Sequence, residues 1–176
     1  MMKPTRLVVA LAIAASGQAA GAATPRMLPA CHAGELSLRL DASPHDLDGS
    51  SEHGIRLVLI NRTTVACRIP GLPTVIFRDA HERSLPIERQ IPPDMHPGPV
   101  VLPAVVPAGG EVGAEVGWST AESSGGKCYS PATIGIVIED KAVVQSATNH
   151  VCAPAGQPAM FTQAWFRSSA TQRATR

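Results

Sequence analysis

The sequence predicts an all-β sandwich of seven to nine short strands. Apolar and polar side chains alternate in several short segments, which is the period of a half-buried strand. Gly, Pro, Asn and Asp separate these segments, and no segment has a helical period of useful length. The four cysteines are a third indication, because exported domains of this size are often linked by disulfides.

The first 22 residues are predicted to be a secretory signal peptide and not part of the fold. Two basic residues precede the apolar run Leu7–Ala15, and Ala20–Ala22 forms an A-x-A cleavage site. A membrane helix needs about 20 apolar residues, which no run in the chain approaches. We therefore expect a periplasmic or extracellular protein, cleaved near Ala22 and without a transmembrane segment. The segment Leu28–Cys31 resembles a lipoprotein cleavage box, but it lies well past the apolar run.

The remaining chain is expected to form one domain. Residues 23–30 are predicted to be a linker, residues 31–167 the sandwich and residues 168–176 a disordered tail. Loss of Lys3 and Arg6 with the signal peptide changes the formal charge from +1 to −1. Basic residues form no stripe, so the sequence predicts binding neither to nucleic acid nor to an anionic membrane.

Cys31, Cys67, Cys128 and Cys152 are predicted to form two disulfides, because the exported compartment is oxidising. Four cysteines allow three connectivities. The sequence favours Cys31–Cys67 together with Cys128–Cys152, because both pairs close local loops, each of which stabilises the fold by roughly 3–4 kcal/mol in the chain-entropy model. A thiolate metal site is not expected, because the sequence has no C-x-x-C pair.

In the first half of the mature chain, short strands alternate with turns. Leu36, Leu38 and Leu40 alternate with polar residues and predict a half-buried strand. Further strands are predicted at Ile55–Ile60 and Thr74–Arg78, on either side of Asn61–Val75, which turns at Pro70-Gly71. Near Pro86 at most an edge strand is expected, because proline donates no ladder hydrogen bond.

The second half begins with Ile91–Gly110, a segment rich in proline and glycine that we expect to be an irregular loop, with a possible strand at Val100–Leu102. Strands are then predicted at Glu111–Ser119, Ile134–Ile138 and Phe161–Arg167, with a further strand beginning near Val143. In the first of these Val112, Ala114, Val116 and Trp118 face inward. Trp165 and Phe166 are consecutive and face opposite sides, so one should be buried while the other is exposed.

A longer pattern spans residues 31–167. Its most specific part is Cys67–Val75, in which Cys, Ile, Gly, Pro and Val occupy alternate positions. The other parts are Cys31 before Leu36, Gly54 before Leu57–Asn61, Val101-Leu102, Pro107–Gly109 before the strand ending in Trp118, Cys128, and Val151-Cys152.

This pattern resembles the bacterial family of small secreted domains called domain of unknown function 4232. The resemblance implies an immunoglobulin-like antiparallel sandwich with two disulfides in the exported compartment. It implies no activity. The chain departs from the family pattern at Pro92–Pro99 and at Glu139–Lys141.

Catalytic motifs are not found in the sequence. Ser124–Lys127 matches S-x-x-K, but that motif requires a helix, and two glycines lie between its Ser and its Lys. The chain contains no G-x-S-x-G, H-E-x-x-H, phosphate loop or dinucleotide fingerprint. We therefore expect no enzymatic activity, although a hydrolytic site assembled only by the fold stays open.

Two weak metal patterns are present, and no cofactor is expected. The segment Asp46–Gly49 resembles half of a calcium loop, but the required carboxylates at its first and last positions are missing. A loose calcium site would use Asp41, Asp46, Asp48 and Glu52. Met95-His96 is a soft-ligand pair that suits Cu(I).

The function expected from the sequence is that of a non-enzymatic binding or structural module of the bacterial cell envelope. Its partner would be an envelope protein or a small ligand, and the Ile91–Gly110 loop would be the recognition surface, because long loops in compact domains are often functional. The alternative is a periplasmic copper or other metal-handling protein that uses Met95 and His96.

Overall fold

The computed structural model describes residues 27–42, 52–91 and 100–168. Within these ranges the chain forms thirteen strands and one 3-10 turn, Ala33–Glu35. The predicted all-β, largely antiparallel class with two disulfides is confirmed, but the predicted count of seven to nine strands is too low. Several strands have only two or three residues, which is too short for an alternating pattern to be recognised.

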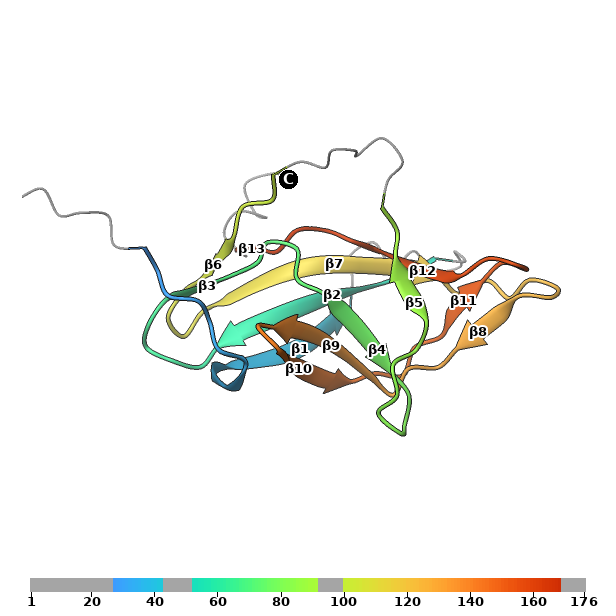
Figure 1. The fold of residues 1–176 in the computed structure, drawn as a ribbon, viewed down its shortest axis with the longest axis horizontal. Helices are drawn as coiled ribbons and strands as arrows, with labels where there is room; N and C mark the ends of the chain where they lie inside the picture. The colour runs from blue at the N-terminus through green and yellow to red at the C-terminus, as the bar shows by residue number, and fades with distance from the viewer. Residues whose placement is uncertain (1–26, 43–51, 92–99, 169–176) are drawn as a thin grey trace, which may run out of the picture.

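The larger sheet has the strand order β1-β2-β7-β12-β5, and β13 also pairs with β7 (Figure 1). All its pairs are antiparallel except β12 with β5, which is parallel. The short strand β5 follows Pro86 and forms the edge of the sheet, as predicted. The strands are β1 (Leu36–Ala42), β2 (Glu52–Asn61), β5 (Ile87–Arg89), β7 (Glu111–Ser119), β12 (Ala159–Gln163) and β13 (Arg167–Ser168).

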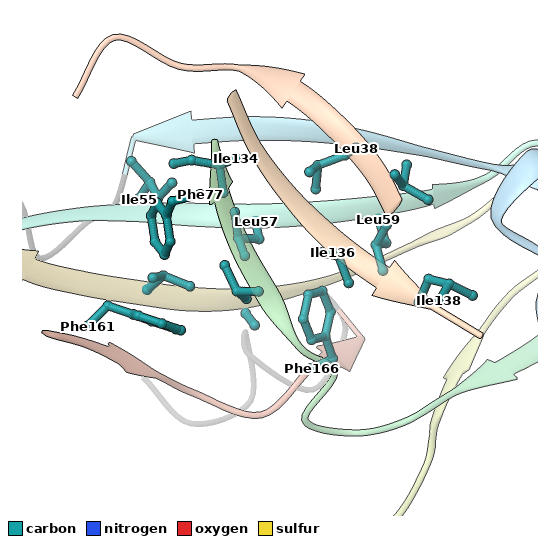
Figure 2. Packing of buried hydrophobic residues seen from close by; sticks show 14 of the residues in the cluster. Leu38, Ile55, Leu57, Leu59, Phe77, Ile134, Ile136, Ile138, Phe161 and Phe166 are labelled. Carbon is teal, nitrogen blue, oxygen red and sulfur yellow. The ribbon is translucent and has the colours of Figure 1, made fainter. Parts of the chain in front are cut away.

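A second sheet of three antiparallel strands, in the order β10-β9-β4, covers one face of the first. These strands are β4 (Val75–Arg78), β9 (Thr133–Ile138) and β10 (Lys141–Ser146). Figure 2 shows the core between the sheets, to which β9 contributes Ile134, Ile136 and Ile138. The Phe77 ring packs edge-on against Trp118 and Phe161, with centroids 6.1 and 5.2 Å apart. With so few aromatic residues, the rest of the core consists largely of Val, Ile and Leu, as the composition requires.

Two small sheets lie at opposite ends of the sandwich, and each contains a disulfide (Figure 1). Strands β3 (Cys67–Ile69) and β6 (Ala104–Val106) pair at one end, where Cys67 bonds to Cys31. Strands β8 (Lys127–Tyr129) and β11 (Val151–Ala153) pair at the other end, where Cys128 lies directly opposite Cys152 and bonds to it. These are the two pairings that the sequence favours.

The proline-rich segment and the C-terminal strand differ from their predictions. Val100–Leu102 forms no strand, and the strand of this segment is β6. The single strand predicted at Phe161–Arg167 is interrupted, because the backbone N–H of Phe166 leaves the sheet and donates to the Gly71 carbonyl at 2.9 Å. Phe166 is buried in the core and Trp165 is 38% exposed, which confirms that the two rings have different environments.

The end of β2 is fixed by Asn61, whose side chain is fully buried. Its Nδ2 donates to the carbonyls of Val65 at 2.8 Å and Pro107 at 3.1 Å. Its Oδ1 accepts from the backbone N–H of Thr63 at 3.0 Å and from the Thr63 hydroxyl at 2.8 Å. One amide therefore joins the β2–β3 turn to the loop between β6 and β7.

A surface contact joins the N-terminal turn to the β9–β10 turn. His32 Nδ1 lies 3.2 Å from Glu139 Oε2, and both side chains are exposed. The hydrogen bond to Glu139, then the charges of Glu139 and Glu35, raise the pKa of His32 above its ordinary value, although burial and Lys141 oppose them. The pKa of His32 is higher in the folded protein than in the unfolded chain. The contact therefore stabilises the fold fully below the unfolded pKa, and this contribution is lost as pH rises through the folded pKa.

We expect the NMR titration midpoint of His32 to lie above 6.5 and to fall in Glu139→Gln, which keeps the shape of the side chain but removes its charge. The His81 ring in the same spectra is the internal control, because its loop follows Arg78, which pairs with Thr133 at the end of β9 away from Glu139. An unchanged His32 midpoint in the variant would contradict the assignment of the shift to Glu139.

Candidate functional site

The outer face of the larger sheet carries a cleft of about 650 Å³. Strands β2, β7 and β12 form its floor and sides, and the segment after β11 forms a wall at one end. Its size is within the usual range of small-molecule sites. The cleft lies on the face opposite the core, so a ligand could enter it without opening the sandwich.

Two glycines of adjacent strands lie opposite each other in the floor of the cleft. Gly54 of β2 and Gly117 of β7 are register partners, and both line the cleft. Thr162 of β12 pairs with Gly117 on the other side, and its hydroxyl donates to the Gly117 carbonyl at 3.2 Å. A Cβ at position 117 would lie 3.2 Å from the Thr162 hydroxyl oxygen. The Thr162 hydroxyl therefore lies over Gly117, and a side chain at position 117 would have to displace it.

Two carboxylates lie at opposite ends of this floor. Glu52 precedes Gly54 by two residues and Glu115 precedes Gly117 by two, so the antiparallel pairing places them on either side of the glycine row. The rows that contain them are four residues apart along the strands, which is about 13 Å. Glu52 and Glu115 are therefore too far apart to act as a close acid–base pair.

Positive charge lies beside the cleft and not in it. The described residues that line it include these two glutamates and His53, but no Lys or Arg. Arg56 is the register partner of Glu115. Its guanidinium covers Gly113, where an added Cβ would lie 2.5 Å from Nε. Because Gly113 is on the far side of Glu115 from Gly117, the guanidinium is displaced from the glycine floor.

The far end of the cleft is apolar and well supported. Pro154, Pro158 and Met160 form this side. Beneath it, the Trp118 indole is buried in the core and donates from Nε1 to the carbonyl of His150 at 2.8 Å. These contacts make the floor a rigid part of the sandwich.

His53 marks the end of β2 nearest this apolar wall. Its ring lies 5.4 Å from the Trp118 ring, and its Nε2 is 3.1 Å from Asn149 Nδ2. The imidazole is thus held by the protein at the edge of the cleft. It lines the site as a fixed polar group beside Trp118.

A serine–histidine contact near β8 was not predicted. Ser130 Oγ lies 3.0 Å from His150 Nδ1, and both residues are exposed. In the described part of the chain no carboxylate contacts this ring. The pair thus lacks the third group that normally orients a catalytic histidine. Only the fold brings these residues together, since they are 20 positions apart.

The structure neither supports nor contradicts the two weak metal motifs of the sequence. Met95, His96, Asp46 and Asp48 lie outside the described residues. Within the described ranges, no group of three or more His, Cys, Asp or Glu residues could hold a metal ion.

The S-x-x-K segment lies in the loop that leads into β8 and not on a helix. Its lysine, Lys127, is on the strand, with Nζ 5.0 Å from the centre of the Tyr129 ring. His32 and His150, each next to a cysteine, are not brought together, because those cysteines belong to different disulfides.

A second candidate surface surrounds Gly71. A Cβ on Gly71 would collide with the Leu102 carbonyl oxygen, and the Gly71 carbonyl accepts from the backbone N–H of Phe166, so the backbones of Leu102 and of the residue after Trp165 both contact Gly71. Leu102 is 77% exposed and Val100 87% exposed. Val105, in the adjoining strand β6, is also exposed. We call Val100, Leu102, Val105 and Trp165 the apolar surface.

Comparison with known proteins gives one match. The family model described as "Domain of unknown function (DUF4232)" matches residues 31–167, which is more than half of the chain. No curated protein and no solved structure matches the chain. In the described residues, no helix is long and apolar enough to cross a membrane.

Proposed function

The chain belongs to the family described as Domain of unknown function (DUF4232), and from this premise we propose that it is an exported, non-enzymatic binding module of the bacterial cell envelope. The signal-peptide pattern of residues 1–22 supports export, and two disulfides are compatible with it. The two sheets and their core supply a rigid frame that presents binding surfaces. N-terminal sequencing of the periplasmic or extracellular protein tests the cleavage near Ala22.

The observation that carries the binding role is the apolar surface. Three of its four residues belong to the proline-rich segment Ile91–Gly110, which the sequence singles out as a recognition loop. Isolated exposed apolar residues are ordinary, but several gathered at one site, with a tryptophan among them, are typical of a protein contact. The Arg167 guanidinium lies 5.8 Å from the centre of the Trp165 ring, at the outer limit of a cation–π contact. We infer that the partner is a second envelope protein with an apolar surface of its own.

Changing Leu102 and Trp165 together to Ser is expected to remove partner binding without loss of the fold, because both side chains are exposed. The measurement is in-cell cross-linking and recovery of the tagged, oxidised protein, with the partner quantified by mass spectrometry. We expect recovery of a stoichiometric partner to fall at least tenfold.

The matched control is Val144→Ser, which removes an apolar side chain that is 46% exposed from β10 in the other sheet. This variant should retain the partner. Equal recovery with the Leu102/Trp165 double variant and with the unmodified protein would show that the apolar surface is not the interface. A further deletion of Pro92–Pro99 tests the contribution of the loop itself.

The alternative function, copper or other metal handling, rests on the Met95-His96 pair alone. Thioether and imidazole ligands suit Cu(I). A Cu(I) titration against a competing chelator tests it, and failure to compete at micromolar chelator would end this alternative.

A further inference from the structure

We propose that Cys128–Cys152 is a site of thiol–disulfide exchange, at which an external dithiol attacks the Cys128 sulfur and frees the start of β8 from β11, while Cys31–Cys67 stays closed. The inference rests on the unequal burial of the four cysteines and on the weak packing of β8. It does not depend on the proposed partner, whose apolar surface includes β6 at the opposite end of the sandwich (Figure 1).

The four cysteines differ in their access to solvent. Cys31, Cys67 and Cys152 are 1%, 4% and 3% exposed, whereas Cys128 lies on the surface. A thiolate must reach one sulfur of a disulfide in order to displace the other, so the rate of exchange depends on access. Cys128–Cys152 offers one exposed cysteine to such an attack, and Cys31–Cys67 offers none. The two disulfides are therefore expected to differ in how readily they are reduced.

Strand β8 depends on its crosslink more than β11 does. In the described sheets β8 pairs only with β11, over three residues of each strand. A two-stranded ladder is marginally stable by itself. All three residues of β11 are buried, but Lys127 and Cys128 of β8 are exposed, and of the β8 residues Tyr129 alone packs against the core. Loss of the disulfide is therefore expected to free β8 from its Lys127 end, while β11 stays packed.

The exchange takes two steps. A thiolate of the dithiol bonds to Cys128 Sγ, the Cys128–Cys152 bond breaks, and Cys152 leaves as a thiolate that takes up a proton. The second sulfur of the dithiol, as its thiolate, then attacks the dithiol sulfur that is bonded to Cys128. Cys128 leaves as a thiolate and is protonated in turn. Two electrons and two protons thus pass from the dithiol to the two cysteines, and the dithiol becomes a disulfide.

The burial of Cys152 limits the rate of this exchange. A buried site disfavours the charged form of a sulfur, so the Cys152 thiolate is a poor leaving group. Reduction should be slower than at an unhindered disulfide, but faster than at Cys31–Cys67, where both sulfurs must first be uncovered by local opening of the core. Reoxidation is direct, because Cys128 and Cys152 are register partners and β11 keeps its place.

The test uses the oxidised mature protein, residues 23–176, without denaturant. Dithiothreitol is the small dithiol and reduced thioredoxin the protein dithiol. Thiols are trapped with N-ethylmaleimide at intervals and assigned by peptide mass spectrometry. We expect Cys128–Cys152 to be reduced at least tenfold faster than Cys31–Cys67. Reduction by both probes would support a protein dithiol as the reductant, and reduction by dithiothreitol alone would support a small one. Equal rates for the two disulfides, or faster reduction of Cys31–Cys67, would overturn the proposal.

A matched pair of variants tests which sulfur is attacked. Cys152→Ser leaves Cys128 as a free thiol, and Cys128→Ser leaves Cys152 as one. With an aromatic disulfide reagent that releases a coloured thiolate, we expect the Cys128 thiol to react at least tenfold faster, because it is the exposed one. Equal rates in two folded variants would contradict attack at Cys128. The reduction experiment on the unmodified protein decides the proposal if either variant does not fold.

Release of β8 is measured with a protease that cleaves only after lysine. The mature chain has two lysines, Lys127 at the start of β8 and Lys141 at the start of β10. Reduction of Cys128–Cys152 should speed cleavage after Lys127 at least tenfold and leave cleavage after Lys141, the internal control, unchanged. Unchanged cleavage after Lys127 would show that β8 is not released. Faster cleavage at both lysines would show that the whole fold opens, and either result would overturn the proposal.

Discussion

Asn61→Asp is expected to destabilise the oxidised protein by about 4 kcal/mol or more at neutral pH. The carboxylate cannot donate the hydrogen bonds that Nδ2 makes to the carbonyls of Val65 and Pro107. It places a negative charge beside both oxygens at a site with no solvent exposure. Leaving two buried acceptors unpaired and burying an uncompensated charge are each costly.

The pH dependence of the stability of Asn61→Asp shows how much of its loss comes from the buried charge. Burial favours the protonated carboxyl, so the folded-state pKa of the new Asp lies above its unfolded value. The folded variant then binds more protons than the unfolded chain, and its stability rises as pH falls toward the unfolded pKa. Asn61→Ala loses the two bonds that Nδ2 donates and also the two that Oδ1 accepts from Thr63, but it adds no charge, so it should lose stability with no such gain at low pH.

Urea unfolding followed by tryptophan fluorescence measures both variants, since Trp118 is in the core. Asn149→Asp is the matched control: it introduces the same charge at a partly exposed position and should cost less than about 1 kcal/mol. If Asn61→Asp unfolds within about 1 kcal/mol of the control, the buried amide does not hold the turn to the β6–β7 loop.

The features of the fold that could be predicted from the sequence are those that depend on the local alternation of apolar and polar residues. The alternation in β7 places Val112, Ala114, Val116 and Trp118 inside, and the structure buries all four. The interruption between β12 and β13 could not be predicted, because it depends on a hydrogen bond from Phe166 to Gly71, nearly a hundred residues earlier in the chain. Local periodicity contains no information about such a partner.

The cleft was missed for a similar reason. In the sequence, Gly117 is predicted to be an outward-facing position of one strand, and Gly54 is predicted to precede another strand. A glycine inside a strand often marks close approach of another group, and this signal was present at both positions. Only the register of β2 with β7 places the two glycines side by side and sets Glu52 and Glu115 at their ends. That register depends on pairing between distant segments.

The two disulfides are expected to contribute unequally, although their loops are similar in length. Cys31–Cys67 spans 36 positions and Cys128–Cys152 spans 24, so the chain-entropy model gives each roughly 3–4 kcal/mol. Their surroundings differ: Cys31 and Cys67 are both buried, whereas Cys128 is exposed. Removing the first pair also leaves an unfilled space in the core beside Asn61, whose Nδ2 lies 3.7 Å from Cys67 Sγ.

We therefore expect Cys31→Ala with Cys67→Ala to cost roughly 5 kcal/mol and Cys128→Ala with Cys152→Ala to cost roughly 3 kcal/mol, from loop entropy plus the burial difference. Each double variant is the control for the other, because both remove one crosslink and leave no free thiol. Urea unfolding of the two proteins under the same oxidising conditions gives the comparison. Equal losses would mean that loop closure alone sets the contribution of a disulfide here. A larger loss at Cys128–Cys152 would mean that the β8–β11 pair, and not the buried junction at Asn61, is the part of the fold that most needs a crosslink.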